Sequence, residues 1–147
     1  MSVRRLTLIR FLAAYAVALV VMGALDAIWL GWLAKSFYQQ QLGALMSDSV
    51  RIVPAAIYYV GFPLVIVYLA LMPSTSLGEA LRRSAVLGLA AFGVYDLTNL
   101  ATLRGYTVLM TVVDMAWGTL ATALGGGAAY HAVIARAANG QTINAPR

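Results

Sequence analysis

The chain has 147 residues, of which 62% are apolar, ten are basic and five are acidic, and its formal net charge is +5. A soluble domain is about one quarter charged, so this composition excludes a soluble domain and a disordered chain. It also excludes a nucleic-acid-binding module, because no basic stripe follows a polar helix face. The lack of cysteine excludes disulfides, thiolate metal sites and cysteine nucleophiles.

Four apolar segments are each long enough to cross a bilayer, which takes about 20 residues per helix. They run approximately over residues 11–33, 53–72, 85–103 and 107–134. The first is too long for the apolar core of a signal peptide, so we expect it to be retained. The short connection over 104–106 makes the last two segments antiparallel neighbours. The prediction is an all-α, polytopic integral membrane protein with one transmembrane domain over 1–147, folded as an antiparallel four-helix bundle.

Arginine and lysine distribute unevenly over the two sides of this bundle, and the richer side of a membrane protein faces the cytoplasm. We therefore predict that both termini are cytoplasmic. The side that holds the termini has Arg4, Arg5, Arg10, Arg82, Arg83, Arg136 and Arg147, and the opposite side has Lys35, Arg51 and Arg104.

The first connection has apolar residues at positions 37, 38, 42, 45 and 46. This spacing is typical of an amphipathic helix that lies in the membrane interface, and it predicts such a helix over 36–46. The alternative is a polar loop with incidental aromatic residues.

Three of the five acidic residues, Asp26, Asp96 and Asp114, lie inside predicted spans, whereas Asp48 and Glu79 lie in predicted connections. An aspartate at the centre of a membrane helix is unfavourable by about 2.5–3.5 kcal/mol. Each of the three is seven residues from the outer end of its span, which is about 10 Å at helical rise. They should therefore share one layer, face the bundle interior, and be hydrogen-bonded or protonated.

Other polar and aromatic side chains fall in the same layer. The pattern Asp-x-x-Trp occurs at Asp26 and again at Asp114, so that each tryptophan can donate to a carboxylate of a neighbouring helix. Small residues around the acids favour close helix packing there. The candidate ligand-binding residues are Asp26, Trp29, Tyr58, Tyr59, Tyr95, Asp96, Asn99, Asp114 and Trp117.

No metal and no cofactor is predicted. The single histidine, His131, lies far from the acid layer, and zinc therefore lacks its nitrogen and sulfur ligands. A hard cation would accept three carboxylates and an amide oxygen, but no loop motif supports such a site. Gly125–Gly127 lacks the lysine and hydroxyl residue of a phosphate-binding loop.

Several stretches resemble the bacterial predicted membrane proteins grouped as domain of unknown function 2177. The stretches are Leu25–Gly31, Phe37–Gly43, Pro54–Tyr59, Gly93–Asn99 and Asp114–Gly118, and the resemblance covers approximately residues 10–135. It implies a four-helix protein of the bacterial inner (cytoplasmic) membrane. It supplies no established activity and no catalytic residues.

Three functional hypotheses remain. The first is binding or transport of a small cationic or amphipathic ligand at the carboxylate and aromatic cluster near the outer leaflet, for which transport would require a homodimer. The second is a membrane-embedded, lipid-modifying enzyme that uses one protonated and one ionised aspartate. The third is an accessory or assembly subunit in which the acids only hold helices together, either within the protein or against a membrane-protein partner. The expected partners are membrane lipids and a lipid-like or cationic ligand, with no nucleic acid.

Overall fold

The computed structural model describes residues 7–47 and 49–135, and over these residues the chain forms helices and turns without a strand. Four helical stretches are long and apolar enough to cross a membrane, namely Leu8–Leu33, Ile52–Leu71, Leu77–Thr102 and Val108–Ile134. The predicted all-α, four-span class is confirmed.

Several spans change helix type along their length. The first consists of α1 (Leu8–Ile28) and the π-helical η1 (Trp29–Leu33), and the second of α3 (Ile52–Val65) and the π-helical η3 (Ile66–Leu71). The third is α4 (Leu77–Thr102), and the fourth is α5 (Val108–Ala129) with the π-helical η4 (Tyr130–Ala135). A helix, α2 (Lys35–Leu42), forms in the segment predicted as 36–46 and is followed by one 3-10 turn, η2 (Gly43–Leu45). Its position in the membrane interface stays a prediction.

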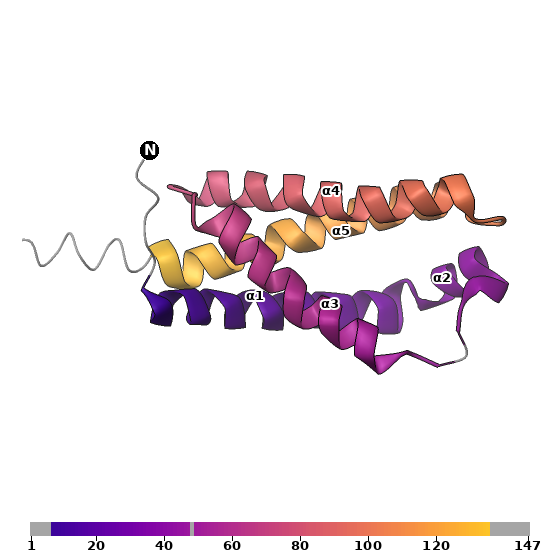
Figure 1. Cartoon of the computed structure of the whole chain (residues 1–147), viewed down its shortest axis with the longest axis horizontal. Helices are drawn as coiled ribbons and strands as arrows, with labels where there is room; N and C mark the ends of the chain where they lie inside the picture. Colours follow the sequence, from indigo (N-terminus) through magenta and orange to yellow (C-terminus); the bar gives the residue numbers. More distant parts are fainter. Residues whose placement is uncertain (1–6, 48, 136–147) are drawn as a thin grey trace, which may run out of the picture.

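The first and last described residues lie at the same end of the bundle, which we call the terminal end (Figure 1). The opposite end, which we call the site end, carries α2 and the turn between α4 and α5. Gly105 adopts a φ of 84° in that turn, a conformation that glycine reaches without strain. Which end faces the cytoplasm stays a prediction. Arg4, Arg5, Arg136 and Arg147, on which it partly depends, lie outside the described residues, as does Asp48.

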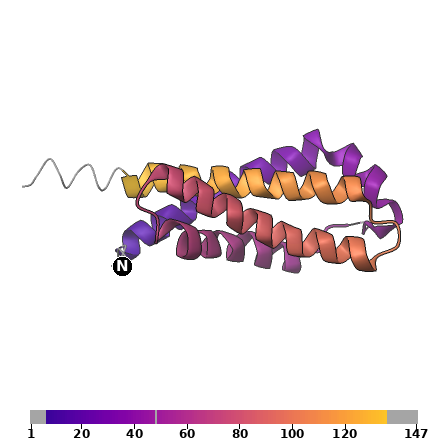
Figure 2. The same cartoon turned by 90° about the horizontal axis from the view of Figure 1, so that it is seen from above.

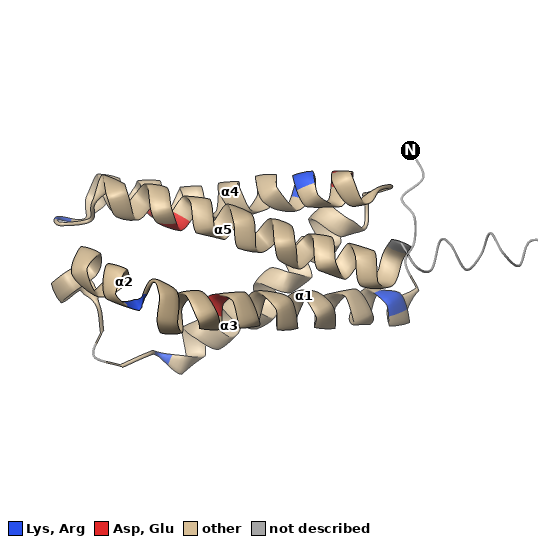
Figure 3. Ribbon diagram, turned by 180° about the vertical axis from the view of Figure 1, so that it is seen from behind, with Lys and Arg blue, Asp and Glu red and all other residues tan. Residues whose placement is uncertain are grey.

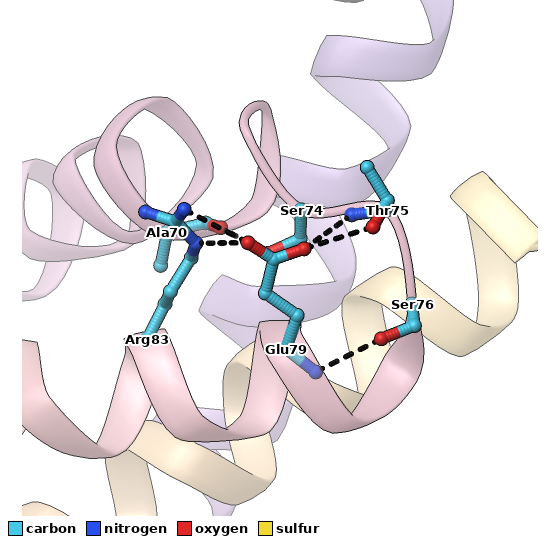
Figure 4. Close-up of polar contacts among 6 residues, drawn as sticks. All are labelled: Ala70, Ser74, Thr75, Ser76, Glu79 and Arg83. Carbon is cyan, nitrogen blue, oxygen red and sulfur yellow. Dashed lines mark hydrogen bonds and ion pairs between the residues drawn. The ribbon is translucent and has the colours of Figure 1, made fainter.

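Helix α4 begins at Leu77 and not at Ala85, so the expectation that Glu79 lies in a connection is wrong (Figure 4). The Ser76 hydroxyl accepts a hydrogen bond from the Glu79 backbone N–H at 3.2 Å, and the Glu79 carboxylate accepts one from the Thr75 backbone N–H at 2.9 Å. Arg83 pairs with the same carboxylate at 2.8 Å. This cap supplies partners for the first turn of the helix, and it starts α4 before the apolar stretch does.

Small residues allow α5 to pack closely against its neighbours, and α4 and α5 lie side by side along the bundle (Figure 2). A Cβ atom added to Gly88 of α4 would come within 2.7 Å of the backbone oxygen of Gly118 and of the Thr122 side chain. A Cβ at Gly125 would come within 2.6 Å of Met22 on α1. The small residues Gly118 and Gly125 of α5 thus lie against α4 and α1, respectively.

Replacing Gly88 by alanine should destabilise the bundle by about 1–3 kcal/mol, because the clash involves backbone and cannot be relieved by one rotamer change. Thermal unfolding in detergent micelles measures this. Gly78→Ala, on the same helix, is the matched control, since a Cβ there meets nothing within 4 Å. Equal melting temperatures for the two variants would contradict the packing assigned to Gly88.

The outside of the bundle is apolar, as lipid contact requires. Large apolar side chains such as Ile9, Val86 and Val112 are 79%, 60% and 59% exposed. Basic positions gather toward the two ends of the molecule, whereas acidic positions lie along the spans (Figure 3). The acids within the spans therefore depart from the apolar character of these helices, and they need polar partners inside the bundle.

Candidate functional site

The three aspartates of the spans come from different helices and are all buried. Asp26 on α1 is 5% exposed, Asp96 on α4 is 0% exposed and Asp114 on α5 is 8% exposed. Because α5 packs between α1 and α4, Asp114 has Asp26 on one side and Asp96 on the other. The layer predicted from their depth is present as a set of interacting side chains.

Two tryptophans link α1 and α5 at this level. The rings of Trp29 and Trp117 stack with centroids 4.3 Å apart and planes 6° from parallel. The Trp117 indole N–H donates to the Asp26 carboxylate at 2.9 Å, as the repeated pattern predicts. The Trp29 indole N–H donates instead to the Tyr38 hydroxyl at 3.2 Å.

Helix α2 closes the site end through polar contacts with the bundle. The Tyr38 hydroxyl donates to the Asp114 carboxylate, and the Thr107 hydroxyl donates to the Gln41 amide oxygen at 2.5 Å. Burial and the bond to Asp114 raise the pKa of Tyr38 well above its ordinary value, so its hydroxyl stays a donor at physiological pH. Trp29 and Tyr38 thus form a chain of two donors that ends on the Asp114 carboxylate.

Asp96 is held from the turn between α4 and α5. The Tyr106 hydroxyl donates to its Oδ1 atom at 2.5 Å, and the Asp96 carboxyl also interacts with that of Asp114. Within residues 7–47 and 49–135 a single ion pair forms, between Arg83 and Glu79, and it lies at the terminal end. No basic side chain of these residues therefore neutralises the three aspartates.

A cavity of about 640 Å³ opens beside the cluster, a size within the range of small-molecule sites. The carboxyl groups of Asp26 and Asp114 supply its acidic lining. The rest of the lining is aromatic or aliphatic: Leu30, Tyr38, Val50, Ala55, Tyr58, Tyr59, Phe62, Ala91, Phe92, Tyr95 and Trp117.

The cavity lies between α3 and α4 and reaches the surface of the bundle there. η3 packs against α4, whereas α3 itself makes at most marginal contact with α4. The rings of Phe62 and Phe92, 6.4 Å apart, bring the two helices together on the side toward η3. Tyr58 and Tyr95 line the cavity and are 37% and 57% exposed. Both tyrosines belong to helices that are long and apolar enough to cross a membrane.

The predicted residues divide into those that line the cavity and those behind it. Asp26, Tyr58, Tyr59, Tyr95, Asp114 and Trp117 line it. Trp29 and Asp96 are attached to its lining through Tyr38 and Asp114. Asn99 lies beside Tyr95 and is not part of the lining.

The sequence interpretation missed two donors, Tyr38 and Tyr106, since both lie outside the apolar spans. Tyr38 was counted only as part of the apolar face of the interfacial helix. Both could have been found from the sequence. Buried carboxyls need hydrogen-bond donors, and each tyrosine lies a few residues beyond the end of a span that carries an acid.

Comparison with known proteins gives one match. The family described as "Predicted membrane protein (DUF2177)" matches residues 11–131. Comparisons with curated proteins and with solved structures gave no match. The matched region includes all three buried aspartates, α2 and the turn that carries Tyr106. The chain belongs to this family of predicted membrane proteins.

Proposed function

We propose that the protein binds an amphipathic molecule of the bilayer that carries an ammonium head group. The observation that carries this proposal is the cavity of about 640 Å³, which joins two buried carboxyls to an apolar opening toward lipid. The head group would lie against Asp26 and Asp114, and the hydrocarbon chain would extend through the gap between α3 and α4.

The chemistry of the lining favours a cation over an anion. Seven of the residues that line the cavity are aromatic, and two are carboxylic acids. Aromatic faces and carboxylates both attract a positive charge, and the attraction is stronger when water is excluded. An anionic head group would meet two carboxyls and no basic side chain among the residues that line the cavity.

The opening favours a ligand that arrives from the membrane. Tyr58 and Tyr95 stand at the exposed part of the lining, and tyrosines place a hydroxyl beside an apolar ring. An amphiphile could keep its chain in lipid while its head group passes these side chains. The basic-residue distribution favours a site end in the outer leaflet of the bacterial cytoplasmic membrane, and we adopt this placement as part of the proposal.

Filling the cavity should remove the ligand. Ala91 is exposed and lines the cavity from α4, so Ala91→Trp would occupy the gap without introducing a charge. The experiment is mass spectrometry of lipids that co-purify with the protein in native-membrane particles. We expect one amphiphile with an amine or quaternary ammonium to be enriched over bulk lipid with the wild type and lost with Ala91→Trp.

Ala90→Trp is the control, because Ala90 neighbours Ala91 and is exposed but does not line the cavity. This variant should retain the enriched molecule. If the wild type enriches only bulk lipids, or if both variants retain the molecule equally, the proposed binding site is wrong.

A further inference from the structure

Asp96 has a carboxyl oxygen without a donor. Its Oδ2 atom is buried and receives no hydrogen bond from the part of the chain that the structure describes, although Tyr106 satisfies Oδ1. A buried polar atom left in this state is costly. The group that faces this carboxyl from α5 is the carboxyl of Asp114. Two ionised carboxylates would repel each other, but one proton between them forms a hydrogen bond and gives Oδ2 a partner.

We infer that Asp96 and Asp114 share one proton in the ligand-free protein, and that an ammonium group entering the cavity displaces it. The first half depends only on the geometry of the pair. The second half rests on the proposed function, because Asp114 lines the cavity and Asp96 does not. Asp96 would then be a positioning residue that acts on the ligand through Asp114.

Among the described residues, the surroundings of the pair contain no positive charge that could take the place of the proton. The titratable groups that interact with the two carboxyls are one further acid and four phenols: Asp26, Tyr38, Tyr58, Tyr95 and Tyr106. Tyr59 reaches the pair through Asp26. A phenol can donate a hydrogen bond but brings no positive charge. Within residues 7–47 and 49–135 the charge of the pair is therefore balanced only by a proton or by a bound cation.

The exchange balances in charge and in protons. One monovalent ammonium enters and contacts the Asp114 carboxylate, and one proton leaves the pair for bulk water. Because the proton and the cation compete, cation affinity should rise about tenfold per pH unit while the pair is protonated and level off once it is ionised.

Infrared spectroscopy tests the shared proton without any ligand. The ligand-free protein should show the C=O stretching band of a protonated carboxyl. Asp96→Asn and Asp114→Asn should each remove this band, since the amide of either asparagine can donate to the remaining carboxylate. Asp26→Asn and Glu79→Gln should retain it. The inference would be overturned if the band were absent from the wild type, or if it persisted in each of the two single variants Asp96→Asn and Asp114→Asn.

Binding of dodecyltrimethylammonium to the protein in lipid nanodiscs, measured against pH, tests the displacement. The wild type should bind more tightly as pH rises, and Asp96→Asn should give a flat profile. Tyr106→Phe keeps both carboxyls, and it is the variant to measure if Asp96→Asn does not fold. It removes the donor to Asp96 Oδ1, so the pair should hold its proton more tightly and the binding curve should shift to higher pH.

The outcomes separate the two proposals. Binding that is equally tight at every pH would reject the displacement while leaving the proposed function intact. No binding of this amphiphile at any pH would reject the proposed function, while the infrared band would still decide whether the pair shares a proton. An unshifted curve for Tyr106→Phe would argue against a proton held next to Tyr106.

Discussion

Asp114→Asn should bind dodecyltrimethylammonium at least about tenfold more weakly than the wild type, a loss of about 1.4 kcal/mol, yet unfold at the same or a higher temperature. Affinity falls because the variant loses a carboxylate that faces the cavity. Stability holds because the asparagine oxygen can accept from Tyr38 and its N–H₂ group can donate to Asp96. The net charge of the pair is also unchanged, because the amide takes the place of the carboxyl that shares the proton. Isothermal titration calorimetry and thermal unfolding, both in nanodiscs, measure the two effects.

Glu79→Gln is the matched control for charge, because Glu79 is an acid of the same chain at the terminal end. It should bind the amphiphile like the wild type. The comparison also separates the three hypotheses raised by the sequence. If the aspartates only hold helices together, all three Asp→Asn variants should melt earlier and no binding should be lost selectively. If the protein is a lipid-modifying enzyme, Asp114→Asn should also remove a lipid product from the membrane.

Trp117→Leu should destabilise the folded bundle by about 2–4 kcal/mol. The substitution removes the stack with Trp29 and also the indole N–H that donates to Asp26, which leaves a buried carboxyl short of a donor. Trp117→Phe keeps a ring for stacking but not the donor, and it should therefore lose an intermediate amount. Unfolding in a mixed-micelle denaturant series measures both.

Trp32→Leu is the control for the general cost of removing an indole, because Trp32 is 79% exposed and lies in η1, at the end of the span that carries Trp29. Its unfolding free energy should stay close to that of the wild type. A loss as large as that of Trp117→Leu would show that the cost comes from membrane anchoring by tryptophan and not from the contact between α1 and α5.

The fold could be predicted from composition and apolar length because lipid imposes one rule on every span: backbone groups must pair within the helix. The start of α4 could not be predicted in this way. Leu77–Ser84 contains too many polar residues to be recognised as part of an apolar span, and its helix is stabilised by the N-terminal cap. There the local donors and acceptors of Ser76 and Glu79 decide the boundary.

The aspartates and tryptophans of the site could be predicted because burying an acid in lipid is costly enough to imply a cluster. Tyr38 and Tyr106 could not be predicted in the same way, because they lie in connections, where a polar side chain has no such cost. In a polar connection a tyrosine is an ordinary residue, and only the fold of α2 and of the turn after α4 shows that these hydroxyls reach Asp114 and Asp96. The cavity also depended on the structure, since the divergence of α3 from α4 has no mark in the sequence pattern.

The stack of Trp29 and Trp117 gives this protein an optical property of its own. Two indoles held 4.3 Å apart and nearly parallel are close enough for their electronic transitions to couple, and coupled chromophores in a chiral site produce a paired circular-dichroism signal that an isolated indole lacks. The chain has three tryptophans, and Trp32, the remaining one, is 79% exposed. Because Trp117 lines the cavity while Trp29 does not, an occupant that tilts one ring against the other would alter the coupled signal, and occupancy could be followed in the unlabelled protein.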